Sequence, residues 1–240
     1  MRSSAPISGR VHETRLAGPA PAPGAAPVAR TEVVISYPAG EAREGAILFP
    51  PHPLLGGDLD NNVILALARA LPLEGLAAFR FNYRGAGRDA AGPGGVPRYE
   101  YWKGVEERAD YAAVLEDARA AHAWACRLFD PAALVGYSFG AVVAARLAAE
   151  DGLPLPLALV CPPFPRLDLG WIADREAPTL VVVAGEDAFG RAPVERLRET
   201  APRARVVRLE GEDHFFVGRE DRVIEVVLDF LRGARKGGKA

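Results

Sequence analysis

The chain has 240 residues, a formal net charge of −2 and an apolar fraction of 49%. This length is sufficient for one sizeable α/β domain, and the charge balance offers no basic surface for nucleic acid or an anionic membrane. No apolar run approaches the roughly 18 residues of a membrane-spanning helix. The two cysteines, Cys126 and Cys161, lack metal-ligand spacing and indicate no disulfide framework, so we expect a cytoplasmic protein.

The two ends of the chain differ in composition from the rest. Residues 1–27 are rich in Ala, Pro and Gly, and because proline interrupts both helices and strands we expect a flexible leader. Residues 234–240 are basic and Gly-rich, and we expect a flexible tail there. Residues 28–233 are predicted to form a single domain. Deleting residues 1–27 is accordingly expected to leave folding and activity unchanged.

From residue 31 onward, strand patterns alternate with helical patterns. Short apolar runs predict buried strands, and longer segments with apolar residues at helical spacing predict helices. The strands are expected at 31–38, 45–50, 76–83, 132–137, 155–161, 178–185 and 204–211, and the helices at 58–71, 104–129, 138–150, 192–200 and 221–233.

The central strands are apolar throughout, which is typical of a parallel sheet with helices on both faces. We therefore predict an α/β fold with three layers and a doubly wound, mostly parallel sheet. Ligands in such sheets bind at the carboxyl ends of the strands.

One turn combines a reactive side chain with that location. The sequence GYSFG places Ser138 between Gly136 and Gly140, directly after the strand 132–137 and before the helix 138–150. A nucleophile on a sharp strand-to-helix bend requires small neighbours at these two positions. A structural turn is the alternative, but the strand–turn–helix context favours a nucleophile.

A serine hydroxyl needs a general base to become a good nucleophile. Of the four histidines, His12 lies in the leader and His122 lies within a predicted helix, where a structural role is expected. His214, in GEDHFF, follows the strand 204–211 and is downstream of the serine. We therefore predict His214 as the base, and His52 is considered below.

The acid that orients the histidine is expected at another strand end, between serine and histidine in the chain. Asp187, in VVVAGEDAF, meets both conditions. Glu186 and Asp213 compete with it. Asp213 adjoins His214 in sequence, so its side chain is expected to point elsewhere.

An oxyanion hole needs two hydrogen-bond donors. The backbone N–H of Phe139, which follows the nucleophile, is the first. The second is expected from the loop PPHPLLGGD after the strand 45–50. Its three prolines have no N–H, which leaves His52, Leu54 and Leu55, and we favour the N–H of His52.

The order serine, acid, histidine, each after a strand, resembles the α/β-hydrolase superfamily. The motifs PHPLLGG, DNN, FRFNYRGAG, GYSFG, GEDAF and GEDHFF resemble compact bacterial serine hydrolases, described as esterase-like or dienelactone-hydrolase-like, over roughly residues 31–233. The resemblance implies Ser138, Asp187 and His214 as a catalytic triad. The family loop commonly reads His-Pro-His-Pro-x-x-Gly-Gly, and here Pro50 replaces its first histidine.

The short segment 162–177 leaves no room for a large cap domain, so we expect an open site for small or short-acyl esters. Phe164, Trp171 and Tyr101 are candidates for its walls, with ordinary packing as the alternative. The long aromatic stretch 88–104 is a candidate for a partial lid.

The predicted function is a serine hydrolase that cleaves such esters through an acyl-enzyme, with no metal or organic cofactor and a small-molecule substrate as its partner. A ligand- or partner-binding protein of this fold that has lost catalysis is the main alternative. A peptidase or thioesterase with the same triad is another, because fold and triad do not determine the substrate. Arg84 is a candidate for binding a substrate carboxylate, but we favour a structural ion pair.

Overall fold

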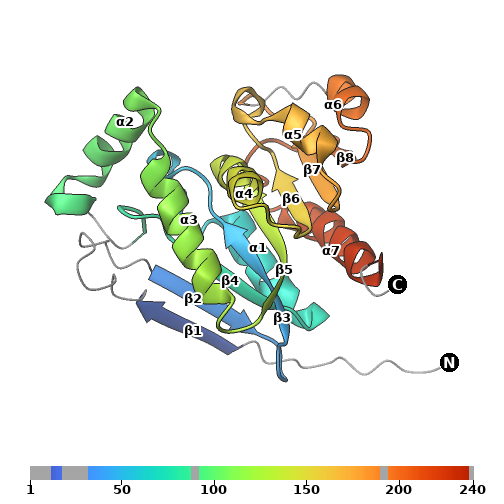
Figure 1. Ribbon diagram of the computed structural model, residues 1–240, viewed down its shortest axis with the longest axis horizontal. Coiled ribbons are helices and arrows are strands. Elements are labelled where there is room, and N and C mark those ends of the chain that lie inside the picture. The colour runs from blue at the N-terminus through green and yellow to red at the C-terminus, as the bar shows by residue number, and fades with distance from the viewer. Residues whose placement is uncertain (1–11, 18–31, 88–91, 190–193, 238–240) are drawn as a thin grey trace.

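The computed structural model describes residues 12–17, 32–87, 92–189 and 194–237. An eight-stranded sheet with the order β1-β2-β4-β3-β5-β6-β7-β8 forms its centre (Figure 1). From β3 to β8 all pairings are parallel, whereas β2 pairs antiparallel with both β1 and β4. The strands are β1 His12–Ala17, β2 Glu32–Tyr37, β3 Glu44–Phe49, β4 Ala77–Phe81, β5 Asp130–Tyr137, β6 Leu157–Val160, β7 Thr179–Ala184 and β8 Arg205–Leu209.

Helices cover both faces of the sheet (Figure 1). One buried cluster joins α3 and α4 to one face, and a second joins α1 and α7 to the other. The α-helices are α1 Asn62–Ala70, α2 Arg98–Arg108, α3 Ala112–Ala125, α4 Phe139–Glu150, α5 Leu169–Asp174, α6 Val194–Thr200 and α7 Glu220–Gly237. The 3-10 helices are η1 Pro53–Leu55, η2 Leu71–Glu74, η3 Pro93–Gly95 and η4 Phe164–Arg166. The predicted three-layer α/β fold is confirmed.

The strand order reverses at β3. The chain passes from β3 through α1 to β4 on one side, and returns through α2 and α3 to β5 on the other. Phe49 at the end of β3 pairs in register with Gly136 near the end of β5. The loop after β3 therefore lies beside the turn after β5, at the type of position where doubly wound sheets bind ligands.

Among the described residues, the segment 162–177 contains only η4 and α5, so no cap domain is inserted there. None of the described helices combines the length and apolar character needed to cross a bilayer.

The predicted helix 104–129 is wrong, because two helices occupy this region. Ala109 adopts a left-handed conformation with φ 49° and ends α2, and its N–H donates to the carbonyl of Glu106. The Asp110 carboxylate then accepts a hydrogen bond from the N–H of Ala112 at the start of α3. The break turns α2 away from the axis of α3 (Figure 1).

The expectations for both ends of the chain need correction. Residues 12–17, predicted to belong to a flexible leader, form β1 and pair with β2 from His12↔Tyr37 to Ala17↔Glu32. The HETRLA segment lacks proline, and its backbone satisfies the open edge of β2. At the other end, α7 extends to Gly237, so residues 234–237 are helical rather than a tail. The remainder of the predicted leader (1–11 and 18–27), and residues 238–240 of the predicted tail, lie outside the described residues.

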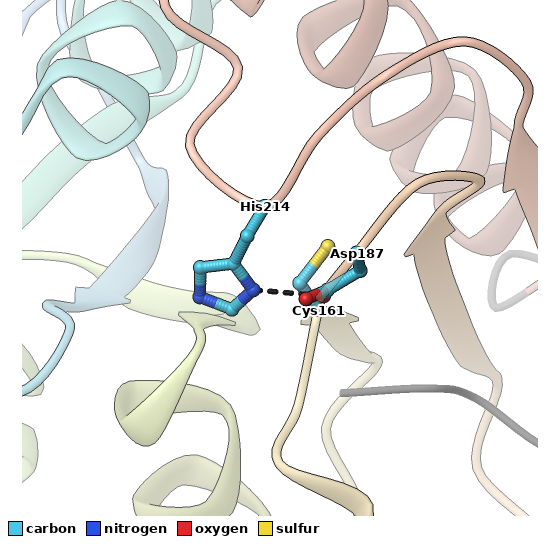
Figure 2. A group of neighbouring side chains, drawn as sticks. All are labelled: Cys161, Asp187 and His214. Atoms are coloured by element: carbon cyan, nitrogen blue, oxygen red, sulfur yellow. Dashed lines mark hydrogen bonds and ion pairs between the residues drawn. The ribbon is translucent and has the colours of Figure 1, made fainter. Parts of the chain in front are cut away.

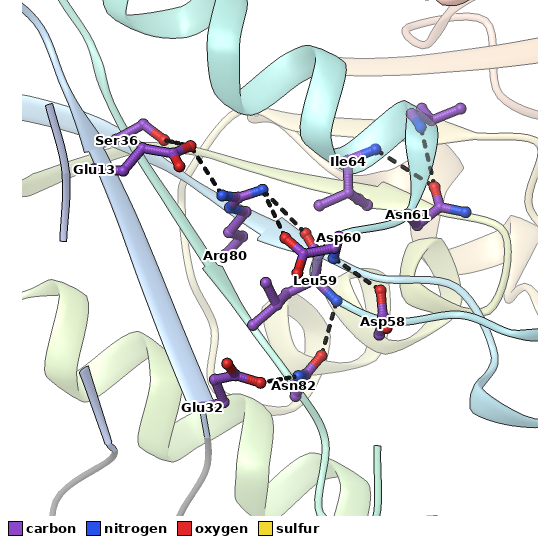
Figure 3. A network of polar contacts seen from close by, with 11 residues as sticks. Glu13, Glu32, Ser36, Asp58, Leu59, Asp60, Asn61, Ile64, Arg80 and Asn82 are labelled. Carbon is purple, nitrogen blue, oxygen red and sulfur yellow. Dashed lines mark hydrogen bonds and ion pairs between the residues drawn. The ribbon is translucent and has the colours of Figure 1, made fainter. Parts of the chain in front are cut away.

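A buried arginine links β1 to the rest of the sheet. Arg80 on β4 is 1% exposed, and its guanidinium contacts Glu13 of β1 at 2.9 Å and Asp60 at 3.3 Å (Figure 3). The Glu13 carboxylate also accepts a hydrogen bond from the Ser36 hydroxyl of β2. A buried charge such as that of Arg80 is costly without partners. Because Glu13 of β1 is one of these partners, the contact holds β1 against the rest of the sheet.

The variant Glu13→Ala is expected to lower the free energy of unfolding by about 1–2 kcal/mol, because the buried guanidinium loses one of its partners. Deleting residues 1–17 is expected to lower the melting temperature further, since it also exposes the edge of β2. Glu199→Ala, at an exposed position on α6, is the control. Thermal melts in which Glu13→Ala and the deletion both match the wild type would restore the flexible-leader interpretation.

Candidate active site

Ser138 occupies a strained turn between β5 and α4. Its backbone has φ 54° and ψ −120°, a conformation that side-chain-bearing residues rarely adopt. A Cβ atom on Gly140 would lie 2.1 Å from the carbonyl oxygen of Phe49, and one on Gly136 would lie 2.4 Å from the carbonyl oxygen of Gly140. Both glycines are therefore required sterically. The turn has the geometry that the GYSFG pattern predicted.

The three residues predicted as a triad come together at the carboxyl ends of β5, β7 and β8. His214 Nε2 lies 3.1 Å from Ser138 Oγ, and His214 Nδ1 lies 2.8 Å from Asp187 Oδ2 (Figure 2 draws the second contact). All three residues are buried, with exposed fractions between 7% and 9%. The network assigns the ring proton to Nδ1, which donates to the carboxylate, so that Nε2 can accept from the serine hydroxyl.

Neighbouring groups fix the imidazole and the carboxylate. The Tyr137 hydroxyl donates to the carbonyl oxygen of His214 at 2.6 Å, and the N–H of Phe189 donates to Asp187 Oδ1 at 2.8 Å. The rings of Phe189 and Phe215 lie 5.3 Å and 5.4 Å from the imidazole. Asp213, which the sequence offered as an alternative to Asp187, accepts hydrogen bonds from the N–H groups of Phe215 and Phe216 in its own turn, as expected.

Cys161, which no sequence motif placed at the site, is a neighbour of the triad. It follows β6 with a positive φ of 44°, is 2% exposed and lies beside Asp187 (Figure 2). Burial, together with the charge of Asp187, raises the pKa of its thiol well above the usual range, so the sulfur stays protonated. A strand end was the only sequence signal for this position.

Cys161, Asp187 and His214 also form a group whose potential metal ligands all lie within 4.8 Å of one another. Sulfur, oxygen and nitrogen ligands suit zinc. However, His214 Nδ1 and Asp187 Oδ2 already share a short hydrogen bond. The triad geometry accounts for this grouping without a metal.

The loop after β3 uses two of its three candidate oxyanion donors internally. The N–H of Leu54 donates to His52 Nδ1 at 3.1 Å, and the N–H of Leu55 donates to the carbonyl oxygen of His52 at 3.0 Å. Within the described part of the chain, the N–H of His52 has no acceptor. Phe139 begins α4, where N–H groups lack partners within the helix. The geometry thus leaves the N–H groups of His52 and Phe139 available.

The imidazole of His52 has a structural role, because both of its ring nitrogens have hydrogen-bond partners. The sequence did not reveal these partners. Its Nδ1 accepts from Leu54, and its Nε2 donates to Glu106 of α2 at 2.7 Å. Burial lowers the pKa of His52, so the ring is neutral. Both nitrogens are engaged, whereas Nε2 of His214 faces a hydroxyl that can transfer a proton. Of these two histidines, only His214 is placed to act as a base.

Glu106 connects three segments around the site. Besides His52, it accepts hydrogen bonds from Arg166 of η4, at 2.7 and 3.2 Å, and from the Tyr111 hydroxyl at 3.1 Å. The hydrogen bond from Arg166 is the largest of the effects that lower the pKa of Glu106 to about 2. The carboxylate is therefore ionised at neutral pH and holds the loop after β3, α2 and η4 together.

The side chains enclose a mostly apolar cavity of about 340 Å³ next to Ser138. This volume suits a small ligand. Its lining residues come from the loop after β3, from α2, from the turn after β5 and from the loops after β6, β7 and β8: His52, Leu54, Leu55, Glu106, Ser138, Phe139, Cys161, Pro163, Arg166, Phe189 and His214.

The three predicted wall aromatics are not part of this lining. Phe164 packs in the core, Trp171 borders a separate surface groove, and the ring of Tyr101 packs against Gly92 and Trp102. These three aromatic residues therefore have packing roles and do not form walls of the cavity. Arg84 forms an ion pair with the buried Asp117 at 2.7 Å, as the favoured interpretation predicted.

The chain is similar to solved structures of α/β hydrolases over nearly its whole length. An alpha-beta serine hydrolase homologue from Coxiella burnetii is 26% identical, with a TM-score of 0.66 and coverage of 97% of this chain and 99% of that one. XC6422 from Xanthomonas campestris, an a/b serine hydrolase without lid, is 26% identical, with a TM-score of 0.64 and coverage of 96% and 97%. A dienelactone hydrolase from Anabaena variabilis, at 18% identity, shares the fold with a TM-score of 0.64 and coverage of 94% and 98%. No protein-family model matches the sequence.

The fold is therefore that of the α/β hydrolases without a large cap domain, as predicted. The chain is similar to compact bacterial serine hydrolases and to a dienelactone hydrolase, and this similarity supports a hydrolase.

The variant Glu106→Ala is expected to lower kcat about tenfold, because it frees the His52 ring and loosens the loop that carries the N–H of His52. Glu106→Gln keeps an acceptor for the His52 ring and is expected to recover most of the activity. Glu107→Ala, at a neighbouring position on α2 with only a 3.6 Å contact to Lys103, is the matched control. Equal activity of Glu106→Ala and Glu107→Ala in ester-hydrolysis assays would contradict this role.

Glu106 is also expected to contribute to acid sensitivity. Its pKa falls from 4.5 to about 2 on folding, so its stabilisation is fully present above 4.5 and is lost as the pH falls toward 2. The difference in unfolding free energy between the wild type and Glu106→Gln should therefore be larger at about pH 6 than at about pH 3. Urea unfolding at both pH values measures it, and a pH-independent difference would argue against the ion pair.

Proposed function

We propose that the protein is a serine hydrolase that cleaves small or short-acyl carboxylic esters through an acyl-enzyme intermediate. One observation carries this proposal: the buried chain of hydrogen bonds from Asp187 through His214 to Ser138, with the serine on a strained turn beside a small cavity. The similarity to serine hydrolases supports the same reaction class.

In the first half of the reaction, Ser138 Oγ attacks the ester carbonyl carbon while His214 Nε2 accepts the hydroxyl proton. Asp187 holds the imidazole in the required tautomer and stabilises its protonated form. The imidazolium then donates the proton to the leaving alcohol. In the second half, water attacks the acyl-enzyme with His214 again as the base, which releases the acid and restores Ser138.

The oxyanion of each tetrahedral intermediate is proposed to bind the N–H groups of Phe139 and His52. Phe139 begins α4, whose positive dipole end adds to this stabilisation. The His52 ring supports the reaction indirectly through its contacts with Glu106 and Leu54.

We further propose a cytoplasmic location. The two cysteines, Cys126 and Cys161, are both free, which fits a reducing compartment.

The variant Ser138→Ala is expected to abolish hydrolysis of p-nitrophenyl esters, because it removes the hydroxyl oxygen that faces the base His214. The wild type is expected to hydrolyse p-nitrophenyl acetate, with rates that fall as the acyl chain lengthens. A fluorophosphonate probe for serine nucleophiles should label the wild type and not the variant. A folded wild type that neither reacts with the probe nor hydrolyses any ester would favour a ligand- or partner-binding protein.

The variant Asp187→Asn is expected to lower kcat by about 10³–10⁴-fold with a much smaller change in KM, because an amide stabilises the wrong imidazole tautomer. Asp213→Asn is the comparison and should lose far less, because Asp213 is next to His214 in sequence but accepts from the N–H groups of Phe215 and Phe216. Similar losses in the two variants would reassign the acid.

A further inference from the structure

We propose, on the basis of the esterase function above, that the Glu106–Arg166 ion pair forms the end wall of the acyl site and sets the limit on acyl length. An apolar groove behind this pair continues the site, and displacing Arg166 opens the site to longer acyl chains.

The orientation of the substrate follows from the position of the base. His214 must reach the leaving oxygen, so the alcohol lies beside the imidazole and next to Phe189, which also lines the cavity. The acyl chain then extends toward the opposite end. Glu106 and Arg166 line the same cavity, and we place them at its acyl end.

A second cavity, of about 220 Å³, begins at the same pair of residues. Glu106, Arg166 and Phe139 line both cavities. Beyond them, the second cavity is lined mainly by apolar side chains of α3 and α4: Val114, Leu115, Val142 and Val143. The ion pair and the Phe139 ring therefore separate two spaces that together would form one longer apolar channel.

The two partners of the ion pair differ in exposure, and Arg166 is the more exposed of the two. Glu106 is held by His52, Tyr111 and Arg166 together. The Arg166 side chain is 43% exposed, and its guanidinium lies over the Tyr111 ring at 5.5 Å from the ring centre. An apolar chain that reached this wall would have to desolvate or break the ion pair, which is costly. Short chains avoid this penalty and long chains do not.

The test compares kcat/KM for p-nitrophenyl octanoate and p-nitrophenyl acetate, expressed as a ratio within each variant. Arg166→Ala is expected to raise this ratio by about tenfold or more, because each methylene buried in the apolar groove adds roughly fourfold. The ratio cancels any general loss caused by disturbing the loop of His52. Arg119→Ala, which removes an exposed arginine paired with Glu150 and Asp151, is the matched control and should leave the ratio unchanged.

Refilling the groove provides the second arm of the test. Adding Val142→Phe to Arg166→Ala should return the ratio toward the wild-type value, because the larger ring occupies the space for the chain. Arg166→Gln, which retains more of the side chain, replaces Arg166→Ala if the latter does not fold, and it should change the ratio in the same direction.

The outcomes separate this proposal from the one on which it rests. A wild type with no Ser138-dependent esterase activity would overturn the proposed function itself. A wild type that hydrolyses acetate, with an unchanged ratio in a folded Arg166 variant, would overturn only the assignment of the wall. A raised ratio that Val142→Phe does not reverse would show that the chain lies elsewhere.

Discussion

The contact between the first turn of α4 and the end of β3 is the constraint on which the site depends. Gly140 approaches the Phe49 carbonyl so closely that no side chain fits between them. This contact sets the sharp turn at Ser138 and brings the N–H of Phe139 to the same edge of the sheet as the loop of His52. Parallel pairing of β3 with β5, in register at Phe49 and Gly136, holds the two backbones at this separation. The strain at Ser138 is thus imposed by the sheet and not by the turn alone.

Each of the two histidines near Ser138 is paired with a carboxylate, but the two pairs have different roles. Each imidazole contacts a carboxylate, but through opposite nitrogens: His214 through Nδ1 and His52 through Nε2. In His214 this leaves Nε2 directed at the serine hydroxyl. In His52 the remaining nitrogen accepts a backbone N–H of its own loop. The carboxylate therefore fixes the tautomer of each ring. It leaves His214 placed to accept a proton and gives His52 a structural role.

The sequence predicted those parts of the site that follow locally from a strand end. Ser138 comes directly after β5, and Asp187 and His214 lie in the loops that follow β7 and β8. Parallel strands bring such residues to one edge of the sheet. Glu106 and Arg166 have no comparable signal, because they are separated by 60 residues and meet only in the folded chain. The same limit explains the break at Ala109 and the misassigned leader. A left-handed residue and an edge strand depend on tertiary contacts more than on hydrophobic periodicity.

Because the described residues contain no cap domain, substrate selection in the proposed hydrolase must come from the residues that line the site. Three of these lining residues, His52, Glu106 and Arg166, come from separate segments, and the Glu106 carboxylate joins them. That carboxylate remains ionised because Arg166 faces it, so the proposed wall of the acyl site also braces the loop that carries the N–H of His52. The same carboxylate thus serves both the acyl wall and the support of His52. A substrate chain long enough to displace Arg166 would also remove one of the groups that fix Glu106, and so would weaken the support of His52. Poor fit at the wall would then reduce the rate of the chemical step as well as binding.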